Sequence, residues 1–244
     1  MNQSLSSQQS LSKQKSDSID SHVSPWLARL LYPLARYLVL PVFFSKIEVT
    51  GQENIPKTEP VIVAPTHRSR WDAMIIPFAV GRLVSGRDLR FMVSANEVKG
   101  LQGWFIRRMG GFPVDTERPG IGSVRHSIKL LHKDEMLVIF PEGGIYRENS
   151  VHPLKRGVAR IALEVESEQP GSEIKILPIS IKYDQPYPSW GSKVIVEIGS
   201  PLNVADYLGD SLRQSSQKLT NALKQSLEKL HKVEDECRLA SSEI

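Results

Sequence analysis

Residues 60–84, PVIVAPTHRSRWDAMIIPFAVGRLV, change character within one short stretch. The run 60–65 is apolar and rich in β-branched residues, which predicts a buried strand. A polar turn follows, and the apolar run 72–84 predicts a helix. A strand, a polar turn and a helix in direct succession are typical of an α/β protein.

The same alternation continues on both sides of this stretch. Strands are predicted at 46–50, 60–65, 89–94, 136–140, 175–182 and 193–198, and helices at 72–84, 100–109, 120–132, 154–167 and 209–235. The last helix carries a leucine stripe, which predicts core packing; it consists of Leu212, Leu219, Leu223, Leu227 and Leu230. We therefore expect an α/β fold with a central sheet flanked by helices, formed by residues 46–204, followed by an amphipathic C-terminal helix and tail in 205–244.

Two N-terminal segments precede this domain. Residues 1–22 are dominated by Ser and Gln, so we expect a disordered tail, and no apolar run typical of a secretory signal is present. Residues 26–44 contain only two charged residues, Arg29 and Arg36, which lie seven apart and are expected to share one helical face. These two arginines and two prolines argue against a membrane span. The composition favours an amphipathic helical segment over 23–45 that lies in a membrane surface and bends at Pro33; the alternative is a helix packed on the protein's own core.

The bulk composition sets few limits. The chain has 244 residues, 40% of them hydrophobic, and a net charge of +4, which is compatible with an anionic partner but specifies none. Its single cysteine, Cys237, excludes an internal disulfide and favours a reducing compartment. No long basic stripe or nucleic-acid-binding motif is present, so we expect no nucleic-acid partner.

His67 and Asp72 lie in the polar turn and at the start of the following helix. On a regular helix, residues five apart are about 140° apart around the axis, so the two side chains meet only if the chain turns between them. The strand–turn–helix pattern supplies this turn, beyond the carboxyl end of a strand, where α/β proteins usually bind ligands. An Asp that orients an imidazole is a general-base arrangement. Arg68 and Arg70, in the same turn, are open to contact with a substrate phosphate or a membrane surface.

A second polar turn follows the strand predicted at 136–140. The stretch VIFPEGGIYR, residues 138–147, ends in Glu142, Gly143 and Gly144, followed by Arg147. Glycines at the end of a strand let the backbone approach a ligand and expose its N–H groups to an anion. Taken alone, the stretch is equally typical of a tight turn with a solvated Glu.

The two motifs together resemble those of the glycerolipid acyltransferase family, enzymes that acylate lysophosphatidic acid and related acceptors. His67-x4-Asp72 precedes Phe140-Pro141-Glu142-Gly143, as in that family. Other segments resemble family blocks in the same order, namely KIEVTGQENIP (46–56), GWFIRRMGGFPVDTER (103–118), LKRGVARIALE (154–164) and ILPISI (176–181).

The resemblance implies roles for individual residues. His67 would deprotonate the acceptor hydroxyl, Asp72 would orient His67, and Glu142, counted with the catalytic residues, would position the acceptor together with Gly143 and Gly144. Arginines of the second and third blocks would bind the acceptor's phosphate. No metal or organic cofactor is implied, because acyl-CoA or acyl carrier protein is a substrate.

The sequence departs from the usual family pattern around the phosphate contacts. Thr66 stands where Asn is usual, three residues separate Gly143 from Arg147, and Arg118 comes third after Asp115. We therefore assign Arg118 and Arg147 to the phosphate. The alternatives are Arg107, Arg108, Lys155 and Arg156.

The resemblance predicts a 1-acylglycerol-3-phosphate O-acyltransferase on the cytoplasmic face of a membrane, peripheral or monotopic. Its partners would be the membrane surface, a lysophospholipid, an acyl thioester and, where this carries the acyl chain, acyl carrier protein. Two alternatives remain open at this point. One is an acyltransferase for another lysophospholipid or for glycerol-3-phosphate, and the other is a non-catalytic protein that binds membrane lipids.

Overall fold

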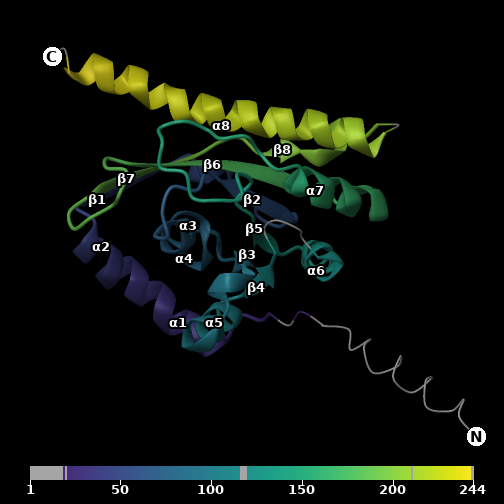
Figure 1. Cartoon of the computed structure of the whole chain (residues 1–244), viewed down its shortest axis with the longest axis horizontal. Helices are drawn as coiled ribbons and strands as arrows, with labels where there is room; N and C mark the ends of the chain where they lie inside the picture. Colours follow the sequence, from purple (N-terminus) through teal and green to yellow (C-terminus); the bar gives the residue numbers. More distant parts are fainter. Residues whose placement is uncertain (1–18, 20, 116–119, 210, 243–244) are drawn as a thin grey trace, which may run out of the picture.

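The protein is built on one eight-stranded sheet with helices on both faces (Figure 1). This architecture is seen in a computed structural model, which describes residues 19, 21–115, 120–209 and 211–242. The strands are β1 (Lys46–Thr50), β2 (Val61–Pro65), β3 (Leu89–Ser94), β4 (Gly111–Val114), β5 (Met136–Val138), β6 (Lys175–Tyr183), β7 (Lys193–Ile198) and β8 (Leu202–Asn203). All six predicted strands are confirmed, whereas β4 and β8 were not predicted.

The sheet is mostly parallel. Its strand order is β1-β7-β6-β2-β5-β3-β4, and β8 pairs with β6. The strand β6 runs antiparallel to β7 and β8, and the other neighbouring strands pair in parallel. The strand β2 is therefore central; its carboxyl end lies close to the carboxyl end of β5 and beside Ile179 of β6, which continues beyond it to Tyr183. Every residue of β2 is buried, as expected for a strand covered on both faces.

Alternate residues of β2 enter two separate cores. Val61 and Val63 pack in one cluster with Ile75 and Ile76, while Ile62 packs in the other. This alternation follows from the two-residue period of a strand. The helices are α1 (Pro25–Leu34), α2 (Leu40–Phe43), α3 (Asp72–Val80), α4 (Arg82–Ser85), α5 (Gly100–Arg108), α6 (Ile121–Leu131), α7 (Gly157–Glu168) and α8 (Leu212–Ser242). Helices α6, α7 and α8 cover one face of the sheet, and α1 to α4 cover the other.

The helix predicted at 72–84 is two helices. Helices α3 and α4 are separated at Gly81, whose ψ of −165° is not helical. A Cβ on Gly81 would lie 2.5 Å from the carbonyl oxygen of Pro77, so the close approach of the chain requires glycine here.

The first helical segment runs from Pro25 to Phe43 through a π-helical turn, η2 (Ala35–Val39). The turn follows Pro33, which lacks the N–H that a regular helix needs. By length and composition alone, this segment could cross a membrane. Of its most apolar stretch of 18 residues, 22% is buried inside the protein. We predicted that Arg29 and Arg36 share one helical face. Arg29 is exposed, whereas Arg36 donates from Nη1 to the Phe78 carbonyl oxygen at 2.8 Å, so the two arginines lie in different surroundings.

The segment Pro25–Phe43 has two apolar faces, so neither the membrane-surface helix nor the helix packed on the protein's own core describes it alone. One face packs on the protein, and its buried residues are Leu27, Ala28, Tyr32 and Leu40. The other face is exposed, and its residues are Trp26, Leu30, Leu34, Tyr37, Leu38 and Val42. The tail predicted to be disordered, residues 1–22, lies mostly outside the described residues, because 1–18 and 20 are not among them. The same holds for 243–244 at the end of the predicted C-terminal tail.

The C-terminal helix α8 lies along the same face of the sheet as α7 (Figure 1). Its residues Leu219, Leu223 and Leu227 are buried in the core beneath it, which confirms the packing role predicted for this part of the stripe. Leu212, at the start of the helix, is 52% exposed and does not pack in this way.

Candidate active site

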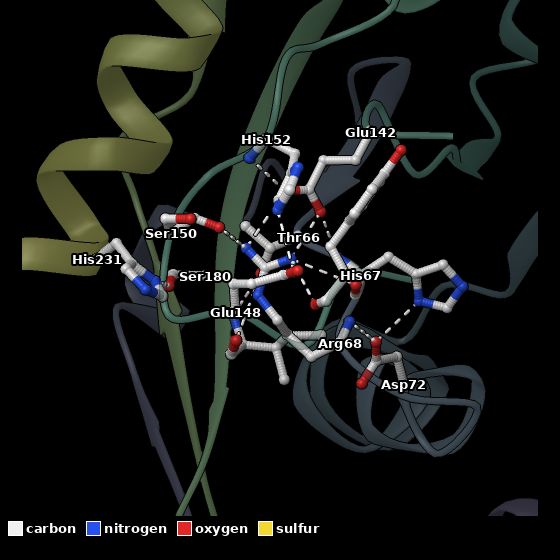
Figure 2. Close-up of polar contacts among 12 residues, drawn as sticks. Thr66, His67, Arg68, Asp72, Glu142, Glu148, Ser150, His152, Ser180 and His231 are labelled. Carbon is white, nitrogen blue, oxygen red and sulfur yellow. Dashed lines mark hydrogen bonds and ion pairs between the residues drawn. The ribbon is translucent and has the colours of Figure 1, made fainter. Parts of the chain in front are cut away.

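His67 and Asp72 meet in the turn between β2 and α3 (Figure 2). His67 Nδ1 lies 2.9 Å from Asp72 Oδ2, and the same oxygen accepts the backbone N–H groups of Arg68 at 2.7 Å and Ser69 at 2.9 Å. Asp72 is fully buried at the N-terminus of α3, where the helix dipole stabilises a negative charge. The chain therefore turns between the two residues as we predicted, and the carboxylate fixes both the loop and the ring.

Tyr183, at the end of β6, is a third member of this group that we did not predict. Its hydroxyl donates to Asp72 Oδ1 at 2.7 Å, so both carboxylate oxygens are engaged. Burial, followed by the negative charge of Asp72, raises the pKa of Tyr183 well above its usual value, and the phenol therefore stays a donor. The sequence held no motif for Tyr183, because it lies 111 residues from Asp72 and reaches it only through the strand order.

The imidazole of His67 is held between Asp72 and Phe140. The two rings stack with their centroids 3.9 Å apart, and the His67 side chain is 19% exposed. With Nδ1 at the carboxylate, Nε2 is the nitrogen left to exchange a proton. Figure 2 shows the ring pointing away from Glu142 and Arg68.

Glu142, for which we predicted a role in positioning the acceptor, is turned toward the protein. It lies in the turn after β5 and is buried, and its carboxylate forms a bidentate pair with Arg68, with contacts of 2.8 Å and 3.2 Å. It also accepts the backbone N–H groups of His67 and His152, at 2.8 Å and 2.9 Å. These contacts direct the carboxylate toward the protein, where it holds the turn that carries His67.

Arg68 is likewise turned inward and is 5% exposed, so it meets neither a membrane surface nor solvent phosphate. Besides Glu142, its guanidinium donates to the carbonyl oxygens of Tyr146 at 3.2 Å and Ser150 at 2.9 Å. The N–H of Tyr146 in turn donates to the His67 carbonyl oxygen at 2.9 Å. The turns after β2 and β5 are therefore joined on both sides of His67 (Figure 2). The sequence contained one signal for this ion pair, namely the opposite charges of Arg68 in the first motif and Glu142 in the second.

Thr66 fixes the same turn to β6. It is fully buried, and its hydroxyl oxygen accepts the N–H of Ile181 at 2.9 Å. This departure from the usual family pattern therefore has a local structural role.

The glycines predicted at the ligand site lie at a cavity. Gly143 has a φ of 75°, in the left-handed region that favours glycine, and a Cβ there would lie 2.6 Å from Cε of Lys155. Gly143, Gly144, Lys155 and His67 all line the cavity.

The two arginines that we predicted to bind the phosphate, Arg118 and Arg147, are not seen at the cavity in the described part of the chain. Arg147 is exposed, with its guanidinium 4.5 Å from the centre of the Tyr187 ring, and it does not line the cavity. Arg118 lies outside the described residues. The Lys and Arg side chains that line the cavity are Arg36, Arg70, Arg125, Lys155 and Arg160.

The cavity has a volume of about 1330 Å³, above the usual range for small-molecule sites of roughly 300–1,000 Å³. Its walls come from both faces of the sheet, because Met74 and Phe78 belong to one core region and Val124 and Ile161 to the other. His67 lies at this wall with an apolar ring, Phe140, against it. The arrangement can bring a proton acceptor to the edge of a large apolar space.

Known proteins resemble this chain in sequence and in fold. A 1-acyl-sn-glycerol-3-phosphate acyltransferase of Bacillus subtilis is 29% identical over 197 residues, which cover 78% of this chain and 90% of that protein. The mitochondrial glycerol-3-phosphate acyltransferase 1 of Sus scrofa is 27% identical over 59% of this chain, a match that covers 19% of that longer protein. The crystal structure of PlsC from Thermotoga maritima, a 1-acyl-sn-glycerophosphate acyltransferase, shares the fold with a TM-score of 0.59 at 21% identity, covering 84% of this chain and 80% of that one.

The family model described as Acyltransferase matches residues 46–182, more than half of the chain. This segment begins at β1, includes the turns that carry His67, Asp72 and Glu142, and ends in β6. The protein is therefore an acyltransferase and belongs to the PlsC-like family of glycerolipid acyltransferases.

Proposed function

We propose that this acyltransferase transfers an acyl chain from acyl-CoA or acyl carrier protein to the free hydroxyl of lysophosphatidic acid, which gives phosphatidic acid. The observation that carries the proposal is the His67 imidazole, oriented by Asp72 and placed at the wall of a large apolar cavity. The name of the Bacillus subtilis relative, a 1-acyl-sn-glycerol-3-phosphate acyltransferase, supports the choice of acceptor.

The proposed reaction is a direct transfer. Nε2 of His67 takes the proton of the acceptor hydroxyl as its oxygen attacks the thioester carbonyl carbon. Asp72 stabilises the imidazolium that forms, and Tyr183 holds Asp72 in place. When the carbon–sulfur bond breaks, the imidazolium returns the proton to the departing thiolate, so the products are an ester and a free thiol. This scheme requires no metal or organic cofactor.

For the acceptor's phosphate we propose Lys155 and Arg70 as ligands, with Arg118 retained from the family resemblance. Lys155 lies against Gly143 and lines the cavity, and Arg70 lines it from the catalytic turn. Arg70 now pairs with Glu97 at 2.7 Å on the surface, where such a pair costs little to break.

For the membrane we propose that the exposed apolar face of Pro25–Phe43 lies in the cytoplasmic surface of a bilayer. A lipid acceptor and an acyl chain both reside in or near membranes, and this segment also lines the cavity through Leu34, Ala35 and Val39. Deletion of 23–45 tests the proposal, because the truncated protein should bind vesicles much more weakly than the full chain, and equal binding would refute it.

A second candidate acceptor is glycerol-3-phosphate. The match to the glycerol-3-phosphate acyltransferase of Sus scrofa favours it, although that match covers only a fifth of the relative's length. A lysophospholipid with a head group is the third arm of the same test, motivated by the exposed position of Arg147.

The test is an assay of the purified full chain against these three acceptors, each with acyl-CoA and with acyl carrier protein. We expect the highest kcat/KM with lysophosphatidic acid, and His67→Ala serves as the control for background transfer. A higher kcat/KM with either of the other acceptors would refute the proposed substrate.

A further inference from the structure

Helix α5 has its apolar side chains on the outside. Leu101 is 74% exposed, Trp104 41% and Phe105 40%, while the residue buried on the inner side is Gly103. A surface helix of a globular protein normally turns its apolar stripe inward. Helix α7 in the same protein does so, with Val158, Ile161, Ala162 and Val165 buried.

Close backbone packing fixes α5 in this orientation. A Cβ on Gly103 would lie 2.5 Å from the carbonyl carbon of Val98, and a Cβ on Gly111 of β4 would lie 2.4 Å from Ile106 Cγ2. The inner side of the helix is therefore filled by backbone and by Ile106. Because Leu101, Trp104 and Phe105 follow at spacings of three and four residues, they share the opposite, outer side.

The C-terminal end of α5 is adjacent to the start of the N-terminal helix. The N–H of Ser24 donates to the Arg108 carbonyl oxygen at 2.8 Å, and Val23 forms a β-bridge with Met109. Figure 1 shows α1 and α5 side by side at the lower edge of the molecule. The start of the exposed face of Pro25–Phe43, at Trp26, is thus next to the end of α5.

Both helices also form part of the cavity wall. Ile106 of α5 and Met109 beyond its end line the cavity, and so do Leu34 and Val39 of the N-terminal segment. The space in front of His67 is therefore enclosed in part by the same two elements whose outer sides are apolar.

The charged side chains of α5 and its flanks are basic, and the nearest acid, Glu97, is engaged by Gln102 and by Arg70. Residues 98–114 contain no Asp or Glu but do contain Lys99, Arg107 and Arg108. Arg107 is exposed, and the Arg108 guanidinium lies 4.7 Å from the centre of a Trp104 ring. Aromatic rings with neighbouring cations are suited to the interface of an anionic bilayer, where a ring enters the headgroup level and a cation meets phosphate.

We propose that α5 is a second membrane-binding element, which inserts Leu101, Trp104 and Phe105 into an anionic bilayer surface beside the N-terminal helix. This inference rests on the proposed membrane association of Pro25–Phe43. With both helices in the interface, the cavity that they share faces the lipid from which a hydrophobic substrate enters.

The test compares the full chain with the variant Trp104→Gln/Phe105→Gln and with Leu101→Gln. Glutamine is a good helix former, and these side chains are not part of the cavity wall, so the fold is retained, as checked by circular dichroism. Leu208→Gln is the matched control for Leu101→Gln, because Leu208 is an exposed leucine at 49% on a different element. Binding is measured by co-sedimentation with vesicles of phosphatidylcholine containing 30% anionic phospholipid.

We expect the double variant to bind vesicles about tenfold more weakly than the wild type, and Leu101→Gln more weakly than Leu208→Gln. Arg107→Gln should lower binding about fivefold on the anionic vesicles but not on pure phosphatidylcholine. Equal binding of the wild type and the α5 variants would overturn the proposal, as would a wild type that does not bind these vesicles.

Two further measurements separate this proposal from its alternatives. Acyl transfer between water-soluble, short-chain substrates should be unchanged in Trp104→Gln/Phe105→Gln and in Leu101→Gln, so a loss of vesicle binding in these variants is independent of whether the proposed acceptor is correct. The alternative occupant of the α5 surface is a second copy of the chain. A wild-type dimer in analytical ultracentrifugation that the α5 variants convert to monomers would overturn the proposal in favour of self-association.

Discussion

The buried pair of Arg68 and Glu142 leads to the sharpest prediction, because it connects the two turns that hold His67. Glu142→Gln keeps the size of the side chain but removes the charge opposite the guanidinium of Arg68, a residue that is 5% exposed. Leaving one partner of a buried ion pair uncompensated typically costs about 3–5 kcal/mol of stability. A domain of ordinary stability has about 5–15 kcal/mol in total, so the variant should fold but unfold at much lower urea concentration.

The double variant Arg68→Met/Glu142→Gln tests the reasoning directly. With both charges removed, no uncompensated ion remains, and the glutamine carbonyl oxygen can still accept one of the N–H groups of His67 and His152. We therefore expect its loss of stability to be smaller than the sum of the two single losses, by roughly 2–3 kcal/mol.

Urea unfolding of the wild type, the two single variants and the double variant gives this coupling energy. Activity, measured per folded molecule, should fall in both single variants because the backbone of His67 loses an anchor. Additive stability losses, or a cost below about 1 kcal/mol for Glu142→Gln, would show that the pair does not organise the site.

Three other variants probe the dyad and the surface. His67→Ala should lower kcat/KM by roughly 10²–10⁴-fold, the usual contribution of a positioned base, while leaving vesicle binding intact; transfer at the wild-type rate would refute the assignment. Tyr183→Phe removes the hydroxyl that donates to Asp72 and should cost about 1–3 kcal/mol of stability, together with a loss of kcat. Because the pKa of Tyr183 is raised, the phenol does not ionise near pH 10, and the wild type and Tyr183→Phe should show pH–rate profiles of the same shape; an alkaline decline specific to the wild type would contradict this. Hydrogen bonds from its own backbone N–H and from Lys175 lower the pKa of Glu59 to about 2 from 4.5, so its stabilisation is present above pH 4.5 and is lost as the pH falls toward 2. Urea unfolding should therefore show Glu59→Gln less stable than wild type by about 0.5–1 kcal/mol at pH 7 and equal to it near pH 2, and a difference that grows in acid would be the wrong sign.

The regular elements could be predicted from the sequence where their patterns were strong. The apolar run of β2 and the periodic leucines of α8 each specified an element and its buried side. The strand β4, with the sequence GFPV, was missed because Gly and Pro usually mark turns. It is tolerated as a strand because it lies at the edge of the sheet, where a missing N–H at Pro113 removes no bond to a further strand.

The site could be predicted only in part. The spacing of His67 and Asp72, with a turn between them, led to the correct local geometry. The direction of Glu142 could not be derived, because a carboxylate beside two glycines is compatible with a ligand as well as with a buried cation. Tyr183 joins the site through the order of the strands, which no local pattern specifies.

The position of the N-terminal helix has a consequence for the order of events during synthesis. The N–H of Gly191 donates to the Phe43 carbonyl oxygen, and β1 pairs with β7, so the residues that anchor this segment to the sheet appear about 146 residues later in the chain. At a synthesis rate of about 5–20 residues per second, this delay is roughly 7–30 s. During that time the nascent helix lacks its anchor at the edge of the sheet, although its packing partners in α3 and α4 are already synthesised. Its exposed apolar face is therefore available to a bilayer or a chaperone before the sheet is complete.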